Sequence, residues 1–200
     1  MNDKALVLGL YGSPRKGGNT ELLLDEALTG AADAGVRTEA IRLCGLRVTP
    51  CTECLSCFNT GACVIDDDMQ GLYPRLLEAE AVILASPIFF YGITAWAKAV
   101  VDRCQALWAR KYVLHDPLLQ GEKKRKGFFL SVGGTKGQRM FDGATLTVKY
   151  FFDAFNAAYA GELLFRGVDA CGDIAKTPDA LSQARAAGRN LAQDLRGSGR

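Results

Sequence analysis

The sequence predicts an α/β fold: a doubly wound, five-stranded parallel sheet with helices on both faces, formed by residues 1–200 as a single domain. Patterns typical of strands alternate with patterns typical of helices five times along the chain, as in a parallel sheet with crossover helices. The run at residues 81–85 is uninterrupted and apolar, as expected of a strand buried on both faces. No internal repeat or linker divides the 200 residues, and this length suits one domain.

The first half of the chain begins with an apolar run at residues 5–11, which predicts the first buried strand. A helix is expected at residues 21–34, with a polar cap at Asn19 or Thr20. Residues 36–43 alternate between apolar and polar side chains, which predicts a second strand nearer an edge of the sheet. A further helix is expected after the three aspartates at 66–68, where the helix dipole favours carboxylates; a hard-metal site is the alternative.

The second half continues the same alternation. The expected elements are a helix at residues 69–79, a strand at 81–85, a helix at 94–110, a strand at 127–132, a helix at 143–158, a strand at 162–168 and a helix at 179–195. The lysine-rich stretch at residues 121–126 is expected to be a solvated loop. A docking patch for an acidic electron carrier is the alternative for that stretch.

The composition is that of a globular protein and excludes several classes. Hydrophobic residues make up 48% and charged residues 23%, and a net charge of +2 does not point to nucleic acid or anionic membrane as a partner. The chain has no run of about twenty apolar residues, so no transmembrane helix is expected. The N-terminal residues predict a first strand rather than a signal peptide, and a cytoplasmic location follows as the expectation. In that reducing compartment, cysteines more often bind metals or catalyse than form disulfides.

The loop after the first strand, Gly-Ser-Pro-Arg-Lys-Gly-Gly-Asn-Thr at residues 12–20, has the position of a phosphate-binding loop at a helix N-terminus. Donors and cations that could hold an anion there are Ser13, Arg15, Lys16, Asn19 and Thr20. The dinucleotide fingerprint is absent, and a triphosphate loop would need Lys and Ser/Thr where this chain has Gly-Asn. A terminal monophosphate fits better; the alternative is a solvated turn.

The loop after the third strand is rich in aromatic residues. Ligands of an open parallel sheet bind at the carboxyl ends of strands where the strand order reverses, so this loop and the first one can meet over one molecule. Candidates to contact a flat ring and its polar edge are Ser86, Pro87, Ile88, Phe89, Phe90, Tyr91 and Gly92. Gly133 and Gly134, after the fourth strand, would form a third wall. A phosphate and a flat heterocycle together describe FMN; the alternative places the aromatics in the core or an oligomer interface.

Four of the seven cysteines lie in one short run, inside an insertion at about residues 44–66. These four are Cys51, Cys54, Cys57 and Cys63. Cysteines separated by two residues are typical ligands of iron–sulfur clusters. The cysteine ligands of structural zinc usually come as two pairs that lie apart in the sequence. The compact run favours a cluster, with zinc and free or redox-active thiols as alternatives. Cys44, Cys104 and Cys171 are expected to be buried small hydrophobic residues.

Residues 12–20, the stretch from Ser86 to Ala95 and the segment from Lys98 to Arg103 resemble the flavodoxin-like NAD(P)H-dependent FMN reductases. The added Cys-x2-Cys-x2-Cys-x5-Cys resembles the branch called iron–sulfur flavoproteins. The resemblance implies a flavodoxin-like sheet of order 2-1-3-4-5, bound FMN, homodimers or homotetramers, and redox function. It also implies that the phosphate is held by the first loop, the isoalloxazine by residues 87–92, and a [4Fe–4S] cluster by the four cysteines.

The leading hypothesis is therefore an iron–sulfur flavoprotein that passes electrons between a donor, NAD(P)H or a ferredoxin-type carrier, and an acceptor. The chemistry belongs to the cofactors, and the protein supplies distance, orientation and potential. The first alternative is an NAD(P)H-dependent FMN or quinone reductase without a cluster. The second is a flavin- or metal-binding sensor module without enzymatic activity.

Overall fold

The computed structural model describes residues 5–123 and 125–197, so Lys124 of the lysine-rich stretch lies outside the described residues. Its centre is a five-stranded sheet of order β2-β1-β3-β4-β5, in which every neighbouring pair is parallel. The strands are β1 (Leu6–Tyr11), β2 (Arg37–Arg42), β3 (Ala81–Ala85), β4 (Arg125–Gly133) and β5 (Ala157–Arg166). The predicted fold class and strand order are confirmed, and β2 is an edge strand as expected.

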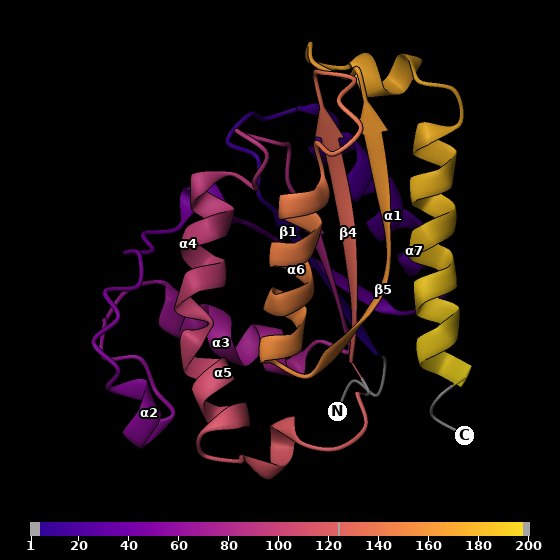
Figure 1. The fold of residues 1–200 in the computed structure, drawn as a ribbon. Coiled ribbons are helices and arrows are strands. Elements are labelled where there is room, and N and C mark those ends of the chain that lie inside the picture. Colours follow the sequence, from indigo (N-terminus) through magenta and orange to yellow (C-terminus); the bar gives the residue numbers. More distant parts are fainter. Residues whose placement is uncertain (1–4, 124, 198–200) are drawn as a thin grey trace.

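Helices cover both faces of the sheet, as Figure 1 shows. They are α1 (Asn19–Asp33), α2 (Cys57–Thr60), α3 (Met69–Glu78), α4 (Ala95–Arg103), α5 (Gln105–Tyr112), α6 (Asp142–Ala154) and α7 (Ala180–Gly197). Short 3-10 helices are η1 (Leu43–Gly45), η2 (Pro117–Leu119) and η3 (Asp173–Lys176). None of the described helices is both long and apolar enough to cross a membrane.

The strands send alternate side chains to two hydrophobic layers, because successive residues of a strand point to opposite faces. Leu8 of β1 belongs to the layer under α3, α4 and α6, whereas its neighbour Val7 belongs to the layer under α1 and α7. Helices α1 and α7 pack closely against each other because Gly30 of α1 and Gly188 of α7 lie at their contact. A Cβ atom at either position would overlap the backbone of the facing helix. This packing fixes α1, whose N-terminus opens onto the candidate site described below.

Three predicted elements differ from the structure. The helix expected at 94–110 is two helices that meet at Cys104. The helix expected at 143–158 ends at Ala154, and the strand expected at 162–168 begins earlier, at Ala157. The reason is Asn156, whose φ of 59° is left-handed and reverses the chain between α6 and β5. Asn tolerates this conformation better than most residues, so the turn was a missed signal.

Two smaller predictions also change. Helix α1 begins at Asn19, with Gly18 at the N-cap position, instead of beginning after a polar cap. The lysine-rich stretch is not all loop, because Arg125 and Lys126 already belong to β4. Of its lysines, Lys123 pairs with Asp153 and Lys126 with Asp194.

Candidate functional site

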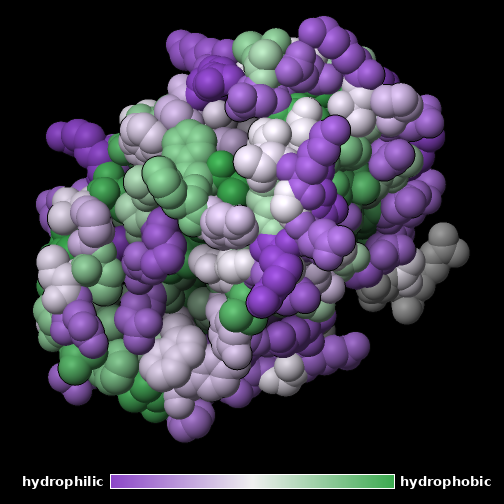
Figure 2. Space-filling view, turned by 45° about the horizontal axis from the view of Figure 1, so that its top comes forward, coloured by the Kyte–Doolittle hydropathy of each residue, from purple (hydrophilic) through white to green (hydrophobic). Residues whose placement is uncertain are grey.

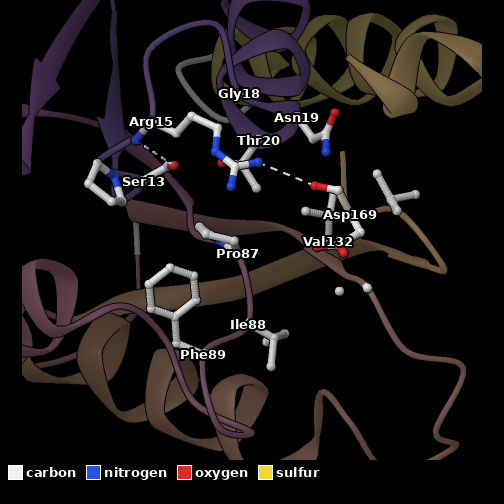
Figure 3. Close-up of a pocket in the computed structure, with 14 residues that line it drawn as sticks. Ser13, Arg15, Gly18, Asn19, Thr20, Pro87, Ile88, Phe89, Val132 and Asp169 are labelled. Atoms are coloured by element: carbon white, nitrogen blue, oxygen red, sulfur yellow. Dashed lines mark hydrogen bonds between the residues drawn. The ribbon is translucent and has the colours of Figure 1, made fainter. Parts of the chain in front are cut away.

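A pocket of about 140 Å³ lies at the carboxyl ends of β1, β3, β4 and β5, at the edge where the strand order predicted a ligand. Its lining consists of Ser13, Pro14, Arg15, Gly18, Asn19, Thr20, Pro87, Ile88, Phe89, Val132, Gly133, Gly134, Val168 and Asp169. Figure 3 shows Arg15 and Thr20 on one side of the pocket and Pro87, Ile88 and Phe89 on the other. The pocket therefore has one polar, cationic end and one apolar end.

The polar end is made mainly by backbone. Gly12 is required after β1, because a Cβ atom there would lie 2.9 Å from the carbonyl oxygen of Ala85. Gly17 has a left-handed φ of 65°, which lets the chain turn into α1. The N-cap residue Gly18 has no side chain to satisfy the first N–H groups of α1. A helix N-terminus in this state attracts an anion through its free N–H groups and its dipole.

Asn19 holds a wall of the pocket in place. Its Nδ2 donates a hydrogen bond to the carbonyl of Ala170 (2.9 Å), and its Oδ1 accepts one from the N–H of Ile174 (3.2 Å). Arg15 reaches the same connection and donates to the carbonyl of Asp169 (3.3 Å). The amide of Asn19 is thus engaged by the protein, whereas the exposed Arg15 guanidinium keeps further donors for a ligand.

Three buried hydroxyl groups tie the strand ends together beneath the pocket. The Oγ of Ser86 accepts a hydrogen bond from the N–H of Thr94 (3.1 Å), and the hydroxyl of Thr94 donates to the carbonyl of Gly12. The hydroxyl of Ser131 donates to the carbonyl of Ser86 (2.7 Å). These bonds link the loops after β1 and β3 to each other and to β4. Ser86 is fully buried and acts in this network instead of lining the pocket.

The aromatic segment after β3 ends in a tight turn. The N–H groups and carbonyls of Phe89 and Gly92 bond each other in both directions, at 2.9 and 3.0 Å. The two central residues, Phe90 and Tyr91, have φ of 48° and 64°, a left-handed conformation that is unfavourable for side chains of this size. Both side chains are exposed, Phe90 completely. Strain of this kind is concentrated at ligand-binding segments, which makes the turn a functional candidate.

The four cysteines of the insertion line a second, smaller pocket of about 20 Å³, next to Arg103, Gln105 and Ala106 at the junction of α4 and α5. Cys57 is buried, Cys63 is half-buried, and Cys51 and Cys54 are exposed. Burial raises the pKa of Cys57, and the three neighbouring thiols raise it further. All four predicted ligands therefore face one cavity.

The four thiols line the same small cavity. No group of three or more His, Cys, Asp or Glu side chains in the described part of the chain is close enough to hold a single ion. A cluster would be bound through one thiolate per iron, and the four thiols that line the cavity supply that number.

The backbone of the cysteine loop also fits an anionic group. Glu53 and Leu55 have φ of 54° and 59°, and Leu55 is followed by Ser56 in the right-handed helical region. Alternation of this kind turns successive N–H groups to one side and forms concavities that attract anions, including iron–sulfur clusters. The N–H of Glu53 already donates to the Sγ of Cys51 (3.5 Å). The loop is thus shaped for a ligand with negative charge.

Comparison with known proteins decides the family. The model of the family described as NADPH-dependent FMN reductase matches residues 5–161. This range includes the loops after β1, β3 and β4 that line the first pocket, and the four cysteines that line the second. The chain belongs to the NADPH-dependent FMN reductase family. Membership in this family supports FMN as the ligand of the pocket at the strand ends.

Proteins similar to this chain include archaeal iron–sulfur flavoproteins. One from Methanocaldococcus jannaschii is 42% identical over 101 residues, which cover 50% of this chain and 52% of that protein. One from Methanosarcina thermophila is 35% identical over 130 residues, which cover 65% of this chain and 64% of that protein. The matched segments thus span about half to two thirds of these relatives' length. A solved flavone reductase shares the fold, with a TM-score of 0.70 at 20% identity over 96% of this chain and 63% of that one.

The structure brings most of the predicted FMN ligands into one pocket. Those that line it are Ser13, Arg15, Asn19, Thr20, Pro87, Ile88, Phe89, Gly133 and Gly134. Those that do not are Lys16, Ser86, Phe90, Tyr91 and Gly92. Lys16 is exposed outside the lining, and Phe90, Tyr91 and Gly92 form the turn beyond Phe89. For the five residues outside the lining, contact with FMN remains a prediction from the sequence.

Sequence reasoning missed several residues of the FMN pocket. Val132, Val168 and Asp169 line it from the ends of β4 and β5. The rule that ligands bind beyond the carboxyl ends of strands could have found Val168 and Asp169, because they follow the last strand. The expectation for Cys171 was wrong: this residue is exposed, and its thiol donates to the carbonyl of Gly17 (3.1 Å). Cys104 is buried as expected, and Cys44 only partly.

Proposed function

We propose that this protein is an iron–sulfur flavoprotein that couples a donor, NAD(P)H or a ferredoxin-type carrier, to an acceptor, with FMN and a [4Fe–4S] cluster as cofactors. The observation that carries the proposal is the pocket lined by Cys51, Cys54, Cys57 and Cys63, in a chain that also has the FMN pocket of its family. The names of the archaeal relatives support it. FMN would supply two-electron and one-electron exchange, and the cluster one-electron exchange.

The residues of the FMN pocket would bind and orient the flavin. The N–H groups at the start of α1, the hydroxyls of Ser13 and Thr20 and the Arg15 guanidinium would hold the phosphate. Pro87, Ile88 and Phe89 would contact the flat ring and exclude water from it. The chain's own contribution is placement, since no acid–base residue is required of it.

The four thiolates would hold the cluster, each through one Sγ atom. Helix α4 connects the two sites: Thr94, immediately before it, bonds to Gly12 under the FMN pocket, and Arg103 at its end lines the cysteine pocket. The nine residues of α4 span about 14 Å at the usual rise of an α-helix. A change at either end of α4 can therefore act on both sites.

We also propose that the protein is a cytoplasmic homodimer or homotetramer. Figure 2 shows more hydrophobic side chains exposed on the side of the molecule that carries α4 and α5 than on the side of α7. Exposed apolar residues in and around these elements include Phe90, Tyr91, Trp96, Leu146 and Tyr150. Clustered exposed apolar side chains are typical of protein interfaces. Light scattering or sedimentation of the FMN-bound protein measures this directly, and a monomer at micromolar concentration would contradict it.

Anaerobic purification followed by a visible spectrum and assays of iron, sulfide and flavin tests the function. We expect flavin together with about four irons and four sulfides per chain. A flavin spectrum without iron or sulfide after reconstitution would support the simple FMN or quinone reductase instead. Absence of bound flavin and of FMN affinity would contradict the whole proposal. A protein that shows no turnover with any pair of donor and acceptor would contradict it as well.

A further inference from the structure

Arg103 is a buried cation that holds both flanks of the cysteine run. Its side chain is 0% exposed and pairs with Asp67 through two hydrogen bonds of 2.6 and 3.1 Å. Its NH1 group also donates to the carbonyl of Thr49 (2.8 Å), and its NH2 group to the carbonyl of Ile65 (3.2 Å). Thr49 precedes the first of the four cysteines and Ile65 follows the last. One guanidinium thus fixes both ends of the segment that bears the thiols.

One donor of this guanidinium has no acceptor. The Nε atom of Arg103 is buried and has no hydrogen-bond partner among the residues the structure describes. A buried donor left unpaired costs about 1–3 kcal/mol, and more when it is charged, so such atoms normally have a partner. Arg37 and Arg42 also carry an unpaired buried nitrogen, but their side chains are 32% and 26% exposed. Arg103 is wholly enclosed.

The position of Arg103 indicates where the missing acceptor lies. Arg103 lines the small pocket together with the four cysteines, whereas its partner Asp67 does not line it. Arg103 is therefore the cationic residue of this lining, which also includes Glu53, and its counterion Asp67 lies outside the lining. Thiolates and the sulfides of a cluster accept hydrogen bonds, and such bonds are among the factors that set a cluster's reduction potential.

We infer that the Nε–H of Arg103 donates a hydrogen bond to a sulfur of the bound cluster, an inference that rests on the proposed function. Arg103 is then a positioning residue with two effects. It holds the cysteine loop in the shape that receives the cluster, through Thr49, Ile65 and Asp67. It also raises the reduction potential of the cluster, because reduction adds negative charge that a nearby cation stabilises.

The test compares the wild type with Arg103→Gln and Arg103→Lys, each reconstituted anaerobically with iron, sulfide and FMN. Arg125→Gln is the matched control, since Arg125 is a half-buried arginine whose Nε and NH2 donate to the carbonyl of Leu77, away from both sites. A redox titration followed by EPR of the reduced cluster and by flavin absorbance gives both potentials. We expect the cluster potential to fall in Arg103→Gln, to fall less in Arg103→Lys, and to stay unchanged in Arg125→Gln. The FMN potential should not move in any of them.

An unchanged cluster potential in a folded, cluster-loaded Arg103→Gln protein would overturn the inference. Should that variant fail to fold, the wild type decides: pulsed EPR of the reduced cluster in protein labelled with ¹⁵N-arginine should show a hyperfine coupling from a guanidinium nitrogen. No such coupling would overturn the inference while leaving the proposed function intact. A wild-type protein that assembles no cluster and gives no cluster EPR signal would instead overturn the proposed function and this inference together.

Discussion

The FMN pocket and the cysteine pocket are built by different means. The FMN pocket is formed at the strand ends by the N-terminus of α1 and the glycines around it. It is supported by the buried hydroxyls of Ser86, Thr94 and Ser131. The cysteine pocket lies in an insertion without a strand, and its flanks are held by the Arg103–Asp67 pair. The first site is a consequence of the fold, whereas the second depends on side-chain contacts that hold the flanks of the insertion.

The largest effect is expected from Asp67→Ala, which leaves Arg103 buried without its counterion. Removal of one partner of a buried ion pair costs about 3–5 kcal/mol. We expect the free energy of unfolding, measured by urea denaturation of the FMN-free protein, to fall by that amount. The control is Asp102→Ala, which removes an exposed i,i+4 pair with Lys98 and should cost about 0.5 kcal/mol. Equal decreases in the free energy of unfolding of the two variants would show that the Arg103–Asp67 pair does not stabilise the insertion.

The second prediction concerns the phosphate end of the FMN pocket. Arg15→Ala should weaken FMN binding by about ten- to a hundredfold, the usual worth of a hydrogen bond to a charged group. Lys16→Ala is the matched control, because Lys16 is the adjacent cation and does not line the pocket. Titration of the apoprotein with FMN, followed by fluorescence quenching, measures both affinities. A larger loss in Lys16→Ala than in Arg15→Ala would place the phosphate elsewhere. Circular dichroism should show an unchanged fold in both variants.

A third prediction separates stability from binding at the aromatic turn. Replacement of Phe90 and Tyr91 by Asn and Gly, the residues preferred in such a turn, should raise the free energy of unfolding by about 1 kcal/mol. The same double variant should bind FMN more weakly, because it loses two of the predicted ring contacts. Thermal unfolding and FMN titration measure the two quantities. A gain in stability with unchanged FMN affinity would show that the turn does not contact the flavin.

The smallest effect is a pH dependence. Burial alone would raise the pKa of Asp67, but hydrogen bonds from Arg103 and from the N–H groups of Thr49 and Met69 outweigh it and lower the pKa. The folded protein therefore binds this proton less readily than the unfolded chain, so the carboxylate's contribution is present above the ordinary value of 3.8 and lost as pH falls through the lowered pKa. At pH values below about 4, we expect the free energy of unfolding to decrease as the pH is lowered. This decrease should be less steep in Asp67→Asn than in the wild type. Parallel slopes would contradict this assignment.

The same contrast explains what could be predicted from the sequence. The strands and the loops after β1 and β3 were predictable, because apolar strands and glycine-rich connections have local signatures, whereas the strand order followed from the resemblance to a known family. The cysteine spacing also placed four thiols at one cavity. Arg103 was different: its partner Asp67 lies 36 residues away, and nothing local predicts that an arginine at the end of a helix is buried. The early start of β5 was missed because it follows the left-handed turn at Asn156.

We propose that this one chain holds FMN in a site made by the fold and a cluster in a site made by the insertion. A reductive titration with dithionite of the anaerobically reconstituted protein tests it most directly, with Cys57→Ala as the comparison because Cys57 is the buried ligand. The wild type should accept about three electrons per chain, two for FMN and one for the cluster, and Cys57→Ala about two with its FMN retained. A wild type that accepts only about two electrons, indistinguishable from Cys57→Ala, would contradict the claim.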